Sequence, residues 1–211
     1  MELDLKNPGL PAPLWAHLDG QLWHATDCDG LSGIIDEGEI KVGFGNRYIG
    51  SFCRNQGCVS LFDFGPTARN VANQDNNMKG WFGHQQNARV PVWLEIDRAS
   101  VLKNLMDAKK AREACNLFID KRCAEGGTHE PGILIIPGVE ACHSGPIPLT
   151  AIVDVLLIDQ NNLDMFRRLG RPDDTSIRQI KDFESTLPAF EKDTIILALE
   201  AGRRRAFKGP I

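Results

Sequence analysis

Residues 22–40 have the sequence LWHATDCDGLSGIIDEGEI, and this stretch determines the expected start of the fold. Residues 21–25 predict a short strand. Asp27 is a favourable helix N-cap, and the apolar residues after it are spaced to fall on one helical face, Leu31, Ile34 and Ile35. Gly38 predicts the end of this helix, because glycine adopts the left-handed backbone conformation found there. A second short strand is expected at 39–42.

Residues 132–158, GILIIPGVEACHSGPIPLTAIVDVLLI, contain two apolar runs that predict strands at 132–136 and 151–158. Glu140 lies between them, next to small or apolar residues, Val139, Ala141 and Cys142. A carboxylate in such surroundings is costly unless it has a partner. Glu140 is therefore either a rim residue that points to solvent or a working acid in a cleft.

The remaining elements are predicted from the same kinds of pattern. Strands are expected at 58–62 and 90–96, and helices near 162–169 and 190–205. A helical region should begin at Asp97 and end near Cys123, with a break or bend near Asp107 that allows one apolar stripe, Leu102, Leu105, Met106, Cys115 and Phe118. Strands in the middle and helices at both ends predict an α+β fold. The polar stretch 74–88 is expected to be a mobile loop beside the site.

Composition restricts the class of protein. The chain has 211 residues, 42% of them hydrophobic and 25% charged, which suits one domain with a core. A net charge of −4 argues against a strongly electropositive nucleic-acid binder. No apolar run approaches the roughly 20 residues that cross a bilayer, and the first residues do not resemble a secretory signal. We therefore expect a cytoplasmic domain whose six cysteines are free thiols, with no metal site.

Two features allow more than one interpretation. His24 at the end of the first strand, beside a helix N-terminus, is placed to bond a ribose or phosphate. The alternative is a partly buried histidine bonded to a main-chain carbonyl. Arginines also form two groups in the second half of the chain, one at Arg167, Arg168 and Arg171 and one at 203–205. They are either ordinary solvated charges or contacts for a phosphate backbone.

Together, the two segments resemble the ADP-ribosyltransferase superfamily. The first segment has a strand with His-x-Thr, then a helix and a glycine. The second has a glutamate followed by I-P-L-x-x-I-x-x-V, and GCVSLF at 57–62 lies where the family has its middle strand. The resemblance covers about 21–64 and 132–158. It is nearest to the DNA-targeting ADP-ribosyltransferase toxins and related phage-defence transferases.

The resemblance implies a fold and a function. The fold would be an ADP-ribosyltransferase-like split β-sheet core with flanking helices over 21–160, between an irregular lead-in at 1–20 and a C-terminal helical extension at 161–211. The function would be an NAD-dependent transferase that modifies a macromolecule, with DNA or RNA as the expected acceptor, in a toxin or phage-defence role. The alternative is a non-catalytic module on the same fold that binds or senses a nucleotide.

The resemblance also implies roles for individual residues. Glu140 would stabilise the positive charge that develops on the ribose when NAD loses nicotinamide, and His24 would hold a ribose hydroxyl. Further NAD contacts are implied for the main chain of Ala25, the hydroxyl of Thr26 and a nicotinamide wall made by Ser60, Phe62 or Tyr48. An arginine would meet the pyrophosphate, from among Arg47, Arg54 and Arg69.

The sequence also departs from the family pattern. Gly138 stands where the arginine-modifying branch has Glu or Gln, so modification of protein arginines is not expected. The single tyrosine, Tyr48, lies ahead of the middle strand and has no match in the His-Tyr-Glu branch. Within the proposed core, we expect His24, Ser60 and Glu140 to line one cleft.

Overall fold

The computed structural model describes residues 10–42, 51–65, 88–124, 135–136 and 138–188. These residues form an α+β fold, as the sequence predicts, around a seven-stranded antiparallel sheet with the order β5-β6-β3-β1-β4-β8-β9. Its strands are β1 (Leu22–Thr26), β3 (Cys58–Asp63), β4 (Val92–Ile96), β5 (Leu105–Met106), β6 (Glu140–Ser144), β8 (Ile152–Asp159) and β9 (Asn162–Gly170). A small second sheet pairs β2 (Glu39–Ile40) with β7 (Ile147–Pro148).

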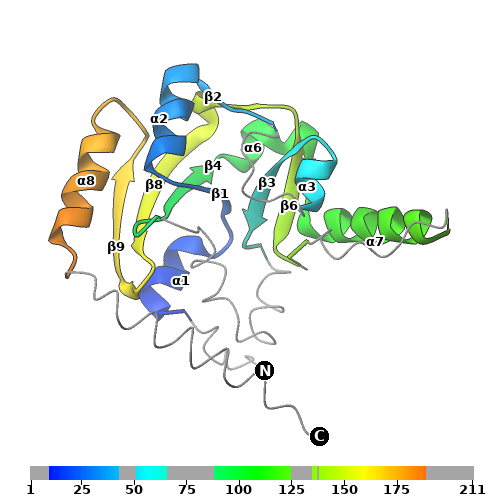
Figure 1. Ribbon diagram of the computed structural model, residues 1–211, viewed down its shortest axis with the longest axis horizontal. Helices are drawn as coiled ribbons and strands as arrows, with labels where there is room; N and C mark the ends of the chain where they lie inside the picture. Colours follow the sequence, from blue (N-terminus) through cyan, green and yellow to red (C-terminus); the bar gives the residue numbers. More distant parts are fainter. Residues whose placement is uncertain (1–9, 43–50, 66–87, 125–134, 137, 189–211) are drawn as a thin grey trace, which may run out of the picture.

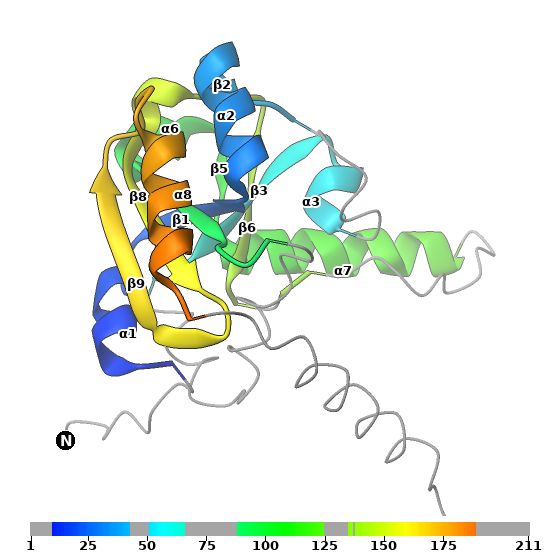
Figure 2. The ribbon, with the colours of Figure 1, turned by 60° about the vertical axis from the view of Figure 1, so that its left-hand side comes forward.

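Helices cover the sheet from several sides (Figure 1). They are α1 (Ala12–Leu18), α2 (Cys28–Glu37), α3 (Phe52–Asn55), α6 (Arg98–Val101), α7 (Ala108–Ala124) and α8 (Ser176–Thr186), with 3-10 turns η1 (Leu102–Asn104) and η2 (Leu149–Ala151). Figure 2 shows α2 and α8 side by side, while α7 extends away from the β5–β6 end. Within the described residues, we find no helix with the length and apolar character needed to cross a membrane.

The sheet opens next to its central strand. β1 pairs with β4 at five positions, from Leu22 opposite Ile96 to Thr26 opposite Val92. It pairs with β3 at two, Leu22 opposite Asp63 and Trp23 opposite Phe62. From His24 onward, β1 continues along β4 and leaves β3. The edge of β3 that carries Ser60 therefore faces a gap in the main-chain ladder.

Three apolar clusters fill the space between the layers. In the first, α2 and α8 pack on one face of the sheet through Leu31, Ile34, Ile180 and Phe183. In the second, α1 packs on Trp23 and Trp93 through Leu14 and Leu18. The third lies at the β6 end and joins α3 and α7 to the sheet through Phe52, Cys53, Ala111, Cys115 and Cys142. The site described below lies where the second and third clusters meet.

The segment quoted first folds as its pattern predicts. The Asp27 carboxylate accepts a hydrogen bond of 2.8 Å from the Gly30 amide and caps α2. Gly38 ends the helix at φ 76°, in the left-handed region that glycine tolerates. The chain then enters β2, which pairs with β7 in the I-P-L motif through Ile40 opposite Ile147.

Several predicted elements are wrong. The segment 162–170 is not a helix but β9, which forms a hairpin with β8. The lead-in at 1–20 contains more helix than the single turn that its sequence allows for, because α1 occupies part of it with its apolar side buried. The expected break near Asp107 is confirmed, because β5 separates α6 and η1 from α7, but Leu102 is 63% exposed and does not join the expected apolar stripe.

The strand that carries Glu140 also differs from expectation. Ile135 and Ile136, the described part of the apolar run at 132–136, are not in a strand. A turn at Gly138, with φ 74°, instead brings the Glu140 amide to the Ile136 carbonyl at 2.9 Å, and β6 begins at Glu140. Apart from Ala88, the expected loop at 74–88 lies outside the described residues, as does the expected helix near 190–205.

Candidate functional site

Glu140 and Ser60 lie on the same face of two neighbouring strands. Glu140 is opposite Phe62 in the β3–β6 register, and Ser60 is opposite Cys142, so the two form a diagonal pair. The Ser60 hydroxyl donates to Glu140 Oε1 at 2.8 Å. Only 6% of Glu140 is exposed to solvent, so this contact is made inside the protein.

Two more donors reach the same carboxylate. The Ser51 hydroxyl, at the start of α3, lies 3.3 Å from Oε1, and the Ile136 amide donates to Oε2 at 3.0 Å. Both carboxylate oxygens are therefore bonded. Burial raises the pKa of Glu140, while the bonds from Ile136, Ser60 and Ser51 act against that rise. A charged Glu140 is thus costly but oriented, and a positive charge nearby would stabilise it.

His24 adjoins this pair through the main chain. Its Nδ1 lies 3.0 Å from the Ser60 carbonyl oxygen, at the opening between β1 and β3. A carbonyl only accepts, so Nδ1 carries the proton and donates, and Nε2 of the neutral ring is an acceptor. Burial lowers the pKa of His24, which favours this neutral form. The ring is therefore suited to accept a hydrogen bond from a hydroxyl.

The prediction that His24, Ser60 and Glu140 line one cleft required their side chains to share one face of the sheet. They do not. His24 is opposite Leu94, a residue of the first apolar cluster, whereas Ser60 and Glu140 lie on the face of Phe62 and Trp23. The His24 ring bonds to Ser60 because the carbonyl lies in the plane of the sheet. The structure thus joins the side chains of Ser60 and Glu140 directly, and joins the His24 ring to the main chain of Ser60.

The other predicted contacts are less closely grouped. Phe62 packs against Trp93, with ring centroids 4.8 Å apart and planes tilted by 56°, and Ala25 lies opposite Trp93. Thr26 ends β1 against the first turn of α2, where a Cβ on Gly30 would lie 2.1 Å from its Oγ1. One guanidinium nitrogen of Arg54, Nη1, is buried and has no hydrogen-bond partner among the described residues. Residues outside the described part of the chain are Tyr48, Arg47 and Arg69.

Ser51 and the covalent bond beside it were not predicted from the sequence. Ser51 caps α3, with its hydroxyl accepting from the Arg54 amide at 3.5 Å, as serine before a short helix often does. Cys53 and Cys142 form a disulfide across a sequence separation of 89 residues, so the expectation of free thiols was wrong for this pair. Cys28, Cys58 and Cys115 are free. Nothing in the spacing of the cysteines identifies the bonded pair.

A cavity of about 420 Å³ lies at the end of β3, and it does not include His24, Ser60 or Glu140. Its lining combines charged side chains with glycines: Gly20, Asp63, Gly65, Arg98, Asp107, Ala108 and Lys109. Asp63 and Arg98 are already joined by hydrogen bonds of 2.5 and 3.2 Å. One lining residue, Asp63, is linked to the strand of Glu140 by its amide, which donates to the Val139 carbonyl at 2.7 Å.

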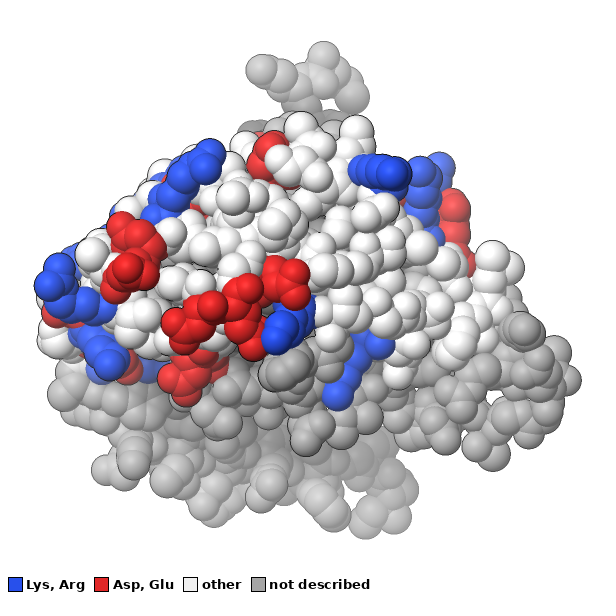
Figure 3. Space-filling model, turned by 90° about the horizontal axis from the view of Figure 1, so that it is seen from above, with Lys and Arg blue, Asp and Glu red and all other residues white. Residues whose placement is uncertain are grey.

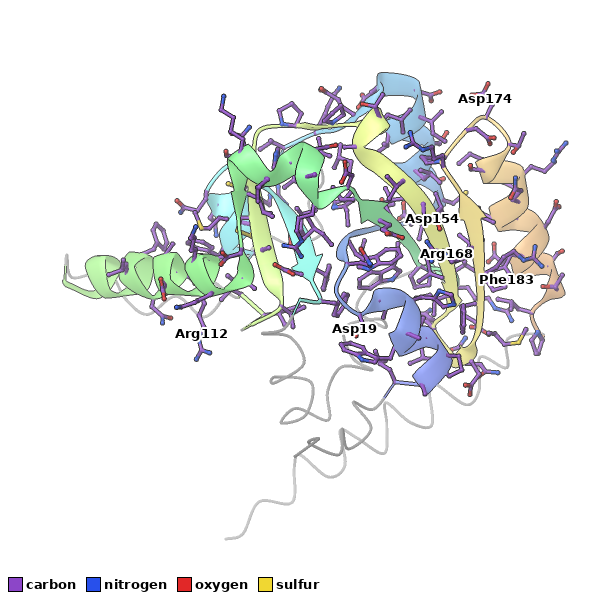
Figure 4. All side chains as sticks on the ribbon, turned by 180° about the vertical axis from the view of Figure 1, so that it is seen from behind. Asp19, Arg112, Asp154, Arg168, Asp174 and Phe183 are labelled. Atoms are coloured by element: carbon purple, nitrogen blue, oxygen red, sulfur yellow. A yellow bond between two sulfur atoms is a disulfide. The ribbon has the colours of Figure 1, made fainter. Side chains whose placement is uncertain are left out.

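The described arginines of the predicted basic group are engaged with the protein itself. Arg168 on β9 faces Asp154 on β8 (Figure 4) and forms ion pairs with Asp154 and with Glu95, the latter at 2.8 Å. Arg167 lies over the Phe183 ring, 5.1 Å from its centroid. Seen from above, acidic side chains of the described residues gather along one side of a broad uncharged area, and basic side chains lie in separate groups (Figure 3). This face carries no continuous basic surface from the described residues.

The arrangement offers a buried, oriented carboxylate and a neutral imidazole, each of which is hydrogen-bonded to Ser60 of β3. Such a pair suits chemistry in which positive charge develops on a bound sugar. No protein-family model, curated protein or solved structure matches the chain. The case for a function therefore depends on the site itself.

Proposed function

We propose that the protein is an NAD-dependent ADP-ribosyltransferase with Glu140 as its catalytic carboxylate and His24 as a ribose-binding residue. The observation that carries the proposal is the link through Ser60, whose hydroxyl donates to Glu140 and whose carbonyl accepts from the His24 ring beside the opening between β1 and β3. A sheet that opens at this strand accords with the split core that the sequence resemblance implies. The acceptor would be a macromolecule, with nucleic acid favoured by that resemblance and a toxin or phage-defence role following from it.

The chemistry follows from the two side chains. Loss of nicotinamide leaves the ribose with the character of an oxocarbenium ion, and a carboxylate nearby stabilises that charge. Glu140 is oriented in advance by Ser60, Ser51 and the Ile136 amide, so little reorganisation is needed when the charge develops. Nε2 of neutral His24 would accept a hydrogen bond from a ribose hydroxyl and orient the sugar.

The test is the release of nicotinamide from NAD by the wild type and by Glu140→Gln. We expect release by the variant to fall by at least about a hundredfold, because a lost preorganised electrostatic contact costs on the order of 3 kcal/mol in the transition state. NAD affinity should change far less, since the bound ribose is neutral before reaction. Equal rates for the two proteins, at equal folded fractions, would refute the catalytic role of Glu140.

A matched control is needed because glutamine is not a neutral replacement here. The Ile136 amide donates to Oε2, and an amide nitrogen at that position would meet another donor. The Glu140→Gln melting temperature must therefore be measured on the same preparation. Ser144→Ala, at the exposed end of the same strand, should leave both release and melting unchanged.

The second candidate is a non-catalytic module that binds or senses a nucleotide. It is favoured by one observation: both Glu140 oxygens already accept hydrogen bonds within the protein, and the residue is almost fully buried. A wild type that binds NAD without releasing nicotinamide, alone or with single-stranded DNA or RNA, would support this candidate over the enzyme.

A further inference from the structure

We propose that Ser51 is a positioning residue for Glu140, and that the Cys53–Cys142 disulfide fixes Ser51 in place, so that the redox state of this bond controls how the carboxylate is held. The effect on catalysis rests on the proposed function, whereas the effect on the carboxylate does not. Neither Ser51 nor the disulfide was part of the site that the sequence predicted.

Two links connect α3 to β6 next to Glu140. Cys53 follows Ser51 by two residues at the start of α3, and Cys142 follows Glu140 by two residues on the same face of β6. The Ser51–Glu140 hydrogen bond and the Cys53–Cys142 disulfide therefore run side by side between α3 and β6. The Cα atoms of the two cysteines are 5.4 Å apart. While the disulfide is intact, α3 cannot move far from β6, so the serine is held close to Glu140 as well.

The helix itself is too short to hold this position alone. α3 comprises Phe52–Asn55, a single turn, and a helix of that length has little intrinsic stability in water. Its other anchor is Phe52, which is buried and lies edge-on to Phe118 of α7 at 6.2 Å. The disulfide closes a long loop, with a sequence separation of 89 residues, and such cross-links restrict the chain most. We therefore assign the placement of Ser51 mainly to the disulfide.

The bond is shielded yet has thiols around it. Cys53 and Cys142 are 0% and 1% exposed, so a reductant reaches the sulfurs only when the apolar cluster around them opens locally. Free Cys115 is buried in the same cluster, and free Cys58 packs against it. A soluble dithiol reduces the bond by two exchange steps: the S–S bond breaks, Cys53 and Cys142 each gain a hydrogen, and the dithiol closes to its own disulfide.

Reduction leaves Glu140 with fewer donors. Without the link, α3 keeps only its packing contacts, Phe52 among them, and we expect the Ser51 hydroxyl to leave Oε1 while Ser60 and the Ile136 amide remain bonded. The ionised carboxylate then loses one of the hydrogen bonds that oppose its burial. The titration midpoint of Glu140 should move to higher pH, and the carboxylate should be less well oriented.

The experiment compares the full chain purified without reductant with the same protein after treatment with dithiothreitol. Peptide mapping by mass spectrometry establishes the bond in the first sample. The Glu140 side-chain carbon is followed by ¹³C NMR as pH is varied, with Glu140→Gln to assign its signal. Ser51→Ala tests the serine, Cys53→Ala with Cys142→Ala removes the bond permanently, and Cys28→Ala is the control because Cys28 is a free thiol on α2.

Four results would support the proposal together. Reduction, the double cysteine variant and Ser51→Ala each move the midpoint upward; Cys28→Ala does not. Reduction of Ser51→Ala produces no further shift, since two changes that act through one contact are not additive. Amide exchange at α3 quickens by roughly tenfold or more on reduction, as expected when a local opening becomes easier.

Three results would overturn it. Mapping that finds both thiols free in air-oxidised protein removes the bond. An unchanged midpoint after reduction, with only a lower melting temperature, makes the disulfide merely structural. A reduction shift that is as large in Ser51→Ala as in the wild type shows that the bond acts by another route. The titration of Glu140 needs no NAD, so the two proposals can fail separately. If the Glu140 midpoint shifts as expected but neither redox state releases nicotinamide, the transferase is refuted and the role of Ser51 and the disulfide is not.

Discussion

The Ser60 hydroxyl donates a 2.8 Å hydrogen bond to Glu140 Oε1 across 80 residues of sequence. This contact joins the middle strand to the strand of the glutamate, and the backbone carbonyl of the same serine receives the His24 ring. Ser60 is therefore the residue through which the two proposed functional groups are connected.

Ser60→Ala should make stability more dependent on pH. Burial raises the folded-state pKa of Glu140 above its unfolded value, so its favourable contribution is full below the unfolded pKa and is lost as pH rises through the folded pKa. Removing the Ser60 donor raises that pKa further and enlarges the loss, by about 1–2 kcal/mol. Urea unfolding between about pH 4 and about pH 8 measures this. Ser144→Ala is the control, and parallel curves for wild type and Ser60→Ala would contradict the prediction.

His24→Phe should remove an acid-dependent loss of stability. Burial lowers the folded-state pKa of His24 from the ordinary 6.5, so the unfolded chain takes up the proton first and wild-type stability falls as pH drops below that value. The variant lacks this fall but leaves the Ser60 carbonyl without the ring donor, at a cost of about 1–3 kcal/mol at neutral pH. Unfolding free energies at about pH 8 and about pH 5 give both effects. An unchanged slope in the variant would show that His24 is not buried in its neutral form.

Two glycines of α2 offer a matched pair. A Cβ at Gly30 would lie 2.1 Å from Thr26 Oγ1, whereas a Cβ at Gly33 meets nothing within 4 Å. Gly30→Ala should therefore destabilise by about 1–3 kcal/mol through forced repacking of Thr26. Gly33→Ala should stabilise by roughly 0.5–1 kcal/mol, because alanine suits a helix better than glycine. Thermal melting of both variants tests this, and destabilisation by Gly33→Ala to a similar extent would argue against the clash.

Arg168→Ala should weaken the β8–β9 hairpin more at high pH than in acid. Burial raises the pKa of Glu95, and Arg168 acts against that rise, so removing Arg168 makes the ionised Glu95 costlier as pH increases. Because Arg168 is 39% exposed, we expect a loss of about 1 kcal/mol near neutral pH. Arg167→Ala, which removes only the contact with the Phe183 ring, is the control and should show no such pH dependence. Equal losses for Arg168→Ala at both pH extremes would exclude the ion pairs as the cause.

What the sequence predicted well was locally determined. The N-cap Asp27 and the terminal Gly38 act within one helix, so α2 follows from its own residues. β9 does not: Leu163, Phe166 and Leu169 are three apart, as on a helical face, but pairing with β8 extends the segment as a strand. Non-local pairing outweighs that local spacing.

The candidate site shows the same division. Glu140 and Ser60 stood out because each is polar among apolar neighbours, and the structure places them in contact. That His24 would approach through a main-chain carbonyl, on the opposite face, depends on where β1 leaves β3. Ser51 and the disulfide were missed because their roles depend on α3 meeting β6, which no pattern within either segment encodes.

The strand order also has a kinetic consequence. In the described sheet, the central strands β3, β1 and β4 lie beside β6 and β8, which come much later in the chain, and the tight hairpin β8–β9 joins strands that are adjacent in sequence. Most hydrogen bonds between strands therefore form only after segments that are distant in sequence come together. The entropy cost of closing those loops precedes the favourable contacts. We expect slow folding in which the β8–β9 hairpin forms early. β1, which pairs with β3 on one side and β4 on the other, should be among the last strands to join the sheet.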